Sequence, residues 1–138
     1  MPSLDIATAL ALLKRALEQA TLQFQKPICV SVCDPQGFLL GFLRADGAPV
    51  RSIAISQGKA YSAVRMGINT DAFFARLQRD NLHPSYYCDA NLTALAGGAV
   101  LKNAAGQIRG GIGISGLAPS EDQQIANSLA EQILQAVD

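Results

Sequence analysis

Four charged side chains in the first half of the sequence have types that could bind and convert a small organic acid. Arg44 or Lys59 could hold a carboxylate, and the fork of an arginine fits a carboxylate well. Asp34 or Asp46 could then act as a general acid or base. However, Asp34 opens the segment 34–37, whose Asp, Pro and Gly positions are typical of a type I turn. An enzyme acting on a small organic acid is therefore the third of three hypotheses for this chain.

The common signatures of nucleotide, zinc and hydrolase chemistry are missing from the sequence. No segment matches the glycine-rich phosphate loop, and the glycines at 97–98 and 110–113 lack the spacing of a dinucleotide-binding fingerprint. There is no Cys-x-x-Cys pair and no pair of histidines, which argues against a zinc site. A catalytic triad would have to use His83, and the segment 113–116 lacks the nucleophile elbow of hydrolases. Hydrolysis is therefore weakly supported.

The composition indicates one globular domain over residues 1–138. Hydrophobic residues make up 49% of the chain and charged residues 16%, which excludes a disordered chain. Eleven basic residues balance eleven acidic ones, so nucleic-acid binding has no electrostatic support. The net charge of zero also favours self-association, because little repulsion opposes it.

The expected location is the cytoplasm. No apolar run approaches the roughly 18 residues that a transmembrane helix needs, so we expect no membrane partner. We also recognise no signal peptide. Cys29 and Cys33 stand too far apart along one predicted strand for a disulfide, and Cys88 is distant in sequence. Three scattered thiols fit a reducing compartment.

The hydrophobic periodicity predicts an α+β fold with the element order α-β-β-α-α-β-β-α. Ser3 could cap the first helix, and the last helix should turn a stripe of four apolar residues towards the core: Ile125, Leu129, Ile133 and Val137. The elements between them are expected at 28–33, 38–44, 52–66, 70–77 and, for a β-hairpin, 95–116. Because tight turns join adjacent strands, we expect an antiparallel sheet flanked by helices.

The second strand of the predicted hairpin has one face that is nearly bare of side chains. Ile112 and Ile114 share the face that suits a core, whereas Gly111 and Gly113 lie on the other. Glycine inside a strand often marks the close approach of another backbone or of a ligand. The bare face therefore lies either under a tightly packed helix or at the floor of a binding pocket.

Polar residues of the helices have simple expected roles. Lys59 stands in the middle of the predicted helix 52–66, where a lysine is usually solvated. At the start of the last helix, Ser120 and Gln123 match a capping box, and the neighbouring acids Glu121 and Asp122 suit the positive end of the helix dipole.

Several short motifs, taken in order, resemble the GlcG/HbpS family. This family includes heme-binding proteins and the C-terminal domain of some corrinoid adenosyltransferases. The resemblance covers nearly the whole chain and rests on these segments: Asp34-Pro35-Gln36-Gly37, Arg44-Ala45-Asp46-Gly47-Ala48, Lys59-Ala60-Tyr61-Ser62-Ala63, Gly97-Gly98, Gly110-Gly111-Ile112-Gly113-Ile114-Ser115-Gly116 and Asp122.

The resemblance implies a profilin-like fold, homo-oligomers and a non-catalytic module that binds heme or a related tetrapyrrole. An alternative that it also implies is an oligomeric accessory protein of a diol, glycerol or glycolate pathway that acts through its surfaces. The resemblance carries over ten motif positions. Gly37 and Asp122 are two of them, and the other eight are taken as ligand-binding: Asp34, Arg44, Asp46, Lys59, Gly98, Gly113, Ser115 and Gly116.

The sequence departs from its heme-binding relatives at the expected iron ligand. Such relatives can supply a histidine near the first helix, and this chain has none there. If the chain binds heme, an axial ligand must be a histidine, tyrosine or cysteine, or another of the few known types. Four such residues cluster on one predicted loop, and we take them as candidate ligands: His83, Tyr86, Tyr87 and Cys88.

Overall fold

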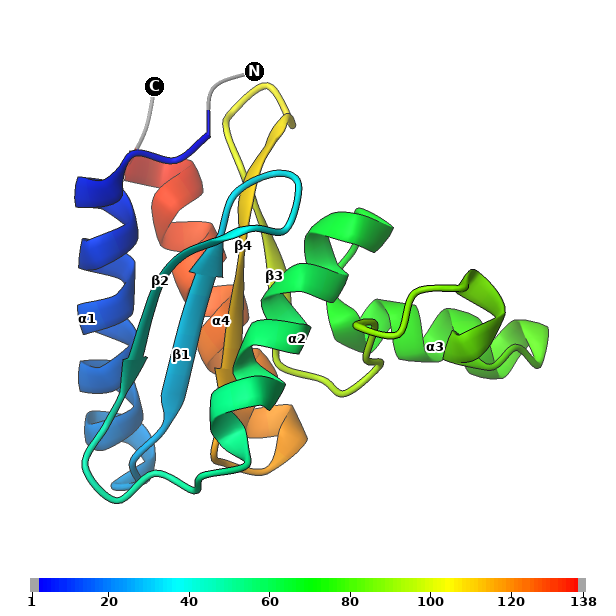
Figure 1. Ribbon diagram of the computed structural model, residues 1–138. Coiled ribbons are helices and arrows are strands. Elements are labelled where there is room, and N and C mark those ends of the chain that lie inside the picture. Colours follow the sequence, from blue (N-terminus) through cyan, green and yellow to red (C-terminus); the bar gives the residue numbers. More distant parts are fainter. Residues whose placement is uncertain (1–2, 137–138) are drawn as a thin grey trace.

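A four-stranded antiparallel sheet with the strand order β2-β1-β4-β3 lies at the centre of this computed structural model, which describes residues 3–136. The strands are β1 (Cys29–Cys33), β2 (Leu39–Arg44), β3 (Gly98–Lys102) and β4 (Ile108–Ser115). The helices are α1 (Ile6–Phe24), α2 (Ser52–Met66), α3 (Thr70–Asp80) and α4 (Pro119–Ala136), with a 3-10 turn at Pro84–Tyr87. The α+β class and the predicted order of helices and strands are confirmed (Figure 1).

One face of the sheet carries the main hydrophobic core. Helices α1 and α4 lie side by side on this face (Figure 1). Side chains from β1 and β4 interdigitate with those of the two helices, and the largest fully buried members are Leu12, Ile28, Val30, Val32, Leu101, Ile112, Ile114, Ile125 and Leu129. The predicted stripe of α4 is confirmed for Ile125, Leu129 and Ile133, and Val137 lies outside the described residues.

Helix α2 covers the other face and lies so close to it that glycines are required beneath. Gly113 of β4 pairs with Gly98 of β3, and both lie under α2. A Cβ atom on Gly113 would collide with the carbonyl oxygen of Ser56, and one on Gly98 would collide with the carbonyl oxygen of Lys59. Of the two alternatives for the bare face, the packed helix is the one that the structure shows.

The two predicted helix caps are wrong. At α1 the cap is Asp5 rather than Ser3, since the Asp5 side chain accepts a hydrogen bond from the backbone N of Thr8. At α4 the carboxylate of Glu121 accepts a hydrogen bond from the backbone N of Ala118, whereas Gln123 turns into the protein interior. Helix α1 thus begins two residues later than a cap at Ser3 would allow, and Ser120 lies inside the first turn of α4 rather than before it.

None of the helices within residues 3–136 is long and apolar enough to cross a membrane.

Candidate functional site

A groove of about 530 Å³ lies between α2 and the hairpin of β1 and β2. It exists because α2 packs mainly over β4, β1 and β3 and leaves the sheet open beside β2. Phe38 and Leu39 line the hairpin side of the groove, and Ile53 and Ala54 line the helix side. Phe38, Leu39 and Ala54 are exposed to solvent, so the groove is an accessible, largely apolar slot rather than part of the core.

Tyr61 and Asp89 form a polar pair at the edge of this groove. Tyr61 lines the groove from α2, and its hydroxyl donates a 2.6 Å hydrogen bond to Oδ2 of Asp89, which lies on the loop after the 3-10 turn. This hydrogen bond is the main cause of the raised pKa of Tyr61 and of the lowered pKa of Asp89. The phenol is therefore held in its protonated form beside an ionised carboxylate.

The ring of Tyr61 is fixed from two sides. The guanidinium of Arg65 lies 4.9 Å from the ring centroid and donates a 2.9 Å hydrogen bond from Nε to the carbonyl oxygen of Gln36. Gly37 faces the ring with φ +99°, and a Cβ atom there would lie 2.7 Å from Cδ1 of Tyr61. The predicted turn at 34–37 thus does more than reverse the chain, because its glycine leaves room for the ring.

Cys33 is another groove-lining residue, and cysteine is a residue type that can bind a metal as its thiolate. Cys33 is only 2% exposed, and burial raises the pKa of its thiol to about 12. Because the thiolate is the form that binds metals, this cysteine is poorly suited to ligation at neutral pH. Cys29, Cys33 and Cys88 are all free thiols, as the sequence predicts.

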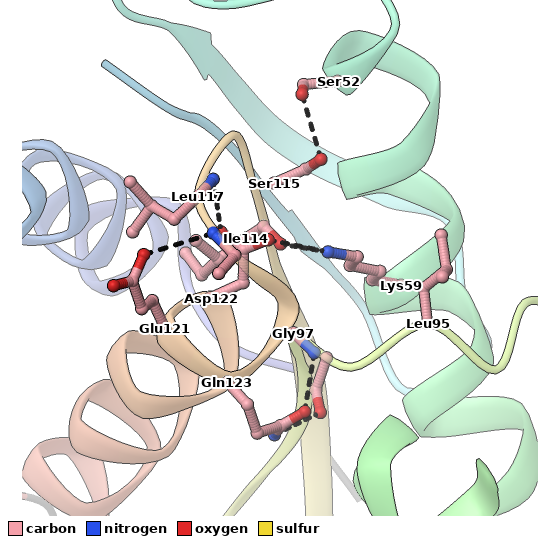
Figure 2. A network of polar contacts seen from close by, with 12 residues as sticks. Ser52, Lys59, Leu95, Gly97, Ile114, Ser115, Leu117, Glu121, Asp122 and Gln123 are labelled. Carbon is pink, nitrogen blue, oxygen red and sulfur yellow. Dashed lines mark hydrogen bonds and ion pairs between the residues drawn. The ribbon is translucent and has the colours of Figure 1, made fainter. Parts of the chain in front are cut away.

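A second polar cluster is buried where α2, β4 and α4 meet. Lys59 Nζ donates hydrogen bonds to Asp122 Oδ2 at 3.1 Å and to the carbonyl oxygen of Ile114 at 2.8 Å (Figure 2). Burial lowers the pKa of Lys59, and burial likewise raises the pKa of Asp122 to about 6. The prediction that Lys59 is solvated is therefore wrong, because its side chain runs inward beneath Gly97.

Gln123 extends this cluster to the start of β3. Its Oε1 accepts a 2.6 Å hydrogen bond from the backbone N of Gly97, and its Nε2 donates to the carbonyl oxygen of Gly98 at 3.0 Å (Figure 2). The hydroxyl of Thr70 accepts a 2.8 Å hydrogen bond from the backbone N of Gly98. The cluster joins α2, α4 and the sheet, and neither Lys59 nor Asp122 lines the groove.

The charged residues of the organic-acid hypothesis are spread over separate places. Oδ1 of Asp34 accepts hydrogen bonds from the backbone N of Gln36 and of Phe38, which makes it a turn former. Arg44 donates to the carbonyl oxygen of Ala48, and Asp46 is exposed in the turn between them. Lys59 is paired with Asp122, so these groups do not converge on one carboxylate-binding site.

Three of the other carried-over positions serve the contact between α2 and the sheet. Gly98 and Gly113 make room for the helix, and Ser115 donates a hydrogen bond to the hydroxyl of Ser52 at 3.0 Å. Gly116 ends β4 with φ +137°, close to the backbone of Ile28. None of the eight carried-over residues lines the groove.

The four candidate iron ligands do lie on one loop, after α3, but none of them lines the groove. His83 Nδ1 accepts a hydrogen bond from the backbone N of Ser85, so Nδ1 is already occupied by a partner on the same loop. Tyr86 is exposed. The ring of Tyr87 packs edge-on against the ring of Phe73, with 5.6 Å between the two ring centroids. Cys88 is exposed at the end of the 3-10 turn.

Sequence reasoning missed Tyr61 and Asp89. Tyr61 belongs to the motif Lys59-Ala60-Tyr61-Ser62-Ala63, in which only Lys59 was predicted as a site residue. Asp89 directly follows the candidate loop. A contact between residues 28 positions apart has no local signature, so the sequence could not pair them. No group of three or more His, Cys, Asp or Glu side chains within the described residues could hold a bare metal ion.

Comparison with known protein families shows to which family the chain belongs. Residues 4–131 match the family model described as "Haem degrading protein HbpS-like". The chain belongs to this family. The resemblance to HbpS-like proteins seen in the sequence motifs is thereby confirmed. No match was found among the curated proteins with which the chain was compared.

Three solved structures illustrate the similarity of this HbpS-like chain to its relatives. HbpS of Streptomyces reticuli, in a double mutant, is 28% identical with a TM-score of 0.86, over 96% of this chain and 88% of that one. A PduOC:heme complex is 26% identical with a TM-score of 0.80, over 94% of both chains. Klebsiella pneumoniae protein ORFY has a TM-score of 0.86 over 100% of this chain and 94% of its own, but at 24% identity it supports the fold alone.

Proposed function

We propose that this HbpS-like chain is a non-catalytic module that binds heme or a related tetrapyrrole in the groove beside α2. The accessible apolar groove carries the proposal, because a flat macrocycle needs two apolar walls and one open edge. Membership of the HbpS-like family and the similarity to a PduOC:heme complex support this class of ligand.

The groove fits such a ligand in size, polarity and charge. A volume of about 530 Å³ lies within the range of about 300–1,000 Å³ that small-molecule sites occupy. Phe38 and Leu39 face Ile53 and Ala54 across the slot. Arg65 is exposed beside Tyr61, where its guanidinium could pair with a carboxylate at the rim of the ligand.

A hemin titration of the purified chain tests the proposal. We expect a saturable Soret shift in the wild type and a much weaker one in Ala54→Trp, because the indole would fill the groove. Ala75→Trp, at an exposed position of α3, is the matched control and should bind like the wild type. A wild type without a saturable shift, or an Ala54→Trp variant that binds normally, would contradict the proposal.

The loop residues remain candidates for the iron ligand. The same titration is run with His83→Ala, Tyr86→Phe, Tyr87→Phe and Cys88→Ser. A Soret shift that is lost in one of these variants would assign the ligand to that residue. The eight carried-over ligand-binding positions also remain a prediction, although Gly98, Gly113 and Ser115 among them serve the packing of α2.

We also expect the chain to form a homo-oligomer. Ile6 and Leu22 of α1 are 65% and 78% exposed, and Leu10 on the same helix is also exposed. Together with the net charge of zero, these apolar side chains favour burial against another copy. Light scattering at micromolar concentration should show a closed assembly, and a monomer alone would refute this expectation.

A further inference from the structure

We infer that Tyr61 supplies an oxygen ligand to the ferric iron of a tetrapyrrole bound in the groove, and that Asp89 accepts the proton which the phenol loses. The inference rests on the proposed function and names the residue that would hold the iron. It differs from the prediction made from the sequence, which placed the ligand on the loop 83–88.

The lining of the groove narrows the choice of ligand. Among the groove residues, only Cys33 and Tyr61 have side chains of a type that commonly ligates heme iron. The Cys33 thiol is buried, and burial keeps it protonated. Tyr61 is partly exposed, and its hydroxyl lies where the groove meets the loop that carries Asp89 and Asn91.

The Tyr61–Asp89 pair has the geometry of a ligand with its base already in place. A phenol binds ferric iron as the phenolate, so the O–H bond must break when the oxygen donates its electron pair to the metal. The proton moves along the existing 2.6 Å hydrogen bond to Oδ2 of Asp89, and then from this partly exposed carboxylate to water. No electron is transferred, and the iron remains ferric throughout.

The surroundings of Tyr61 hold its ring in one orientation before any ligand arrives. Gly37 and Arg65 enclose the ring, and Asp89 fixes the direction of the hydroxyl. Asp89 is itself held, because its Oδ1 accepts a 3.0 Å hydrogen bond from the backbone N of Asn91. Such preorganisation suits a metal-binding site, whose ligands depend on their hydrogen-bonded neighbours for orientation.

The first experiment compares Tyr61→Phe with Tyr86→Phe, in each case with hemin as the probe. The wild type should show a phenolate-to-iron charge-transfer band in addition to the Soret shift. Tyr61→Phe keeps the ring contacts, so the protein should fold, but the band should vanish and binding should weaken. Tyr86→Phe should retain the band, since Tyr86 lies outside the groove. A band that survives in Tyr61→Phe, or disappears in Tyr86→Phe, overturns the inference.

The second experiment follows how fast the band appears after mixing Asp89→Asn with hemin. The amide occupies the same space but cannot take the proton. The band should therefore appear at least about tenfold more slowly at neutral pH. The difference from the wild type should shrink as the pH rises, because hydroxide then serves as acceptor. Asp80→Asn, on exposed α3, is the control and should match the wild type. Equal rates and equal pH profiles for Asp89→Asn and the wild type would remove Asp89 from the inference.

These outcomes separate the inference from the proposed function. Hemin binding that is blocked by Ala54→Trp but spectrally unchanged in Tyr61→Phe would support the groove as the binding site. It would also show that Tyr61 is not the iron ligand. If hemin does not bind to the wild type at all, both fail together.

Discussion

The two faces of the sheet are built by different physical means. The face under α1 and α4 is filled by branched and aliphatic side chains that interdigitate, such as Ile112, Ile114 and Leu129. The face under α2 is rich in glycine and serine instead, and hydrogen bonds there accompany a small apolar cluster of Cys33, Ala60 and Val64. Ser31 pairs with Ser56 at 2.8 Å, for example. The first face depends on apolar area, and the second depends on close approach and exact hydrogen-bond partners.

This difference places the groove on the α2 side. A helix that lies so close to β4 cannot also cover β2, so the edge of the sheet stays open where Phe38 and Leu39 stand. On the apolar face, by contrast, α1 contacts both β1 and β2. The polar face is therefore where one change in packing should have the largest effect on stability.

The largest effect is expected for Gly113→Val. The added side chain would meet the backbone of α2 at Ser56 and Ala60, and backbone atoms cannot move aside as the end of a side chain can. We expect a loss of at least about 3 kcal/mol in the free energy of unfolding, or no folded protein. Urea denaturation followed by circular dichroism measures it. An unchanged midpoint would mean that α2 does not lie against β4 as described.

A loss of similar size is expected for Lys59→Met. The change leaves the carboxylate of Asp122 buried without its cation, which costs about 3–5 kcal/mol when a buried pair is broken. Lys59→Met combined with Asp122→Leu should recover part of this loss, because no charge is then buried. Full stability of the single variant would show that the ion pair does not hold α2 to α4.

The pair should also give the protein a pH dependence of known sign. Burial raises the pKa of Asp122 from an ordinary value of 3.8 to about 6, so the folded protein binds this proton more tightly than the unfolded chain does. Between about pH 4 and pH 6 the contribution of Asp122 to the free energy of unfolding should therefore fall as the pH rises. Denaturation curves across this range should lose that component in Asp122→Asn and keep it in Asp80→Asn. The same profile in the wild type and Asp122→Asn would contradict the assignment.

The smallest effect, and the only gain, is expected for Gly58→Ala. Gly58 lies on the side of α2 that lines the groove, away from Gly113, and an added Cβ would make an ordinary 3.6 Å contact with the methyl of Thr93. A glycine within a helix is less favourable than alanine, so we expect a gain of about 0.5–1 kcal/mol. Thermal melts compare it with Gly113→Val. A loss similar to that of Gly113→Val would mean that the two sides of α2 are equally tight.

Much of the fold was predictable from the sequence because it depends on local patterns. The alternation of Cys29 to Cys33, the turn at 34–37 and the apolar stripe of α4 each specify an element through neighbouring residues. The glycines of β4 also predicted a close approach. They could not show whether a helix or a ligand approaches, since both need the same bare strand.

The sequence by itself determined the helices and strands, their order and the family motifs, because helix and strand periodicity is a local property of neighbouring residues. Tertiary structure alone decided that Lys59 is buried against Asp122, 63 positions away, and that Tyr61 meets Asp89 at the groove. A lysine or tyrosine in a helix has the same local signal whether it faces water or a partner. Only the position of α2 on the sheet, set by Gly98 and Gly113, directs Lys59 inward and leaves Tyr61 at the open edge.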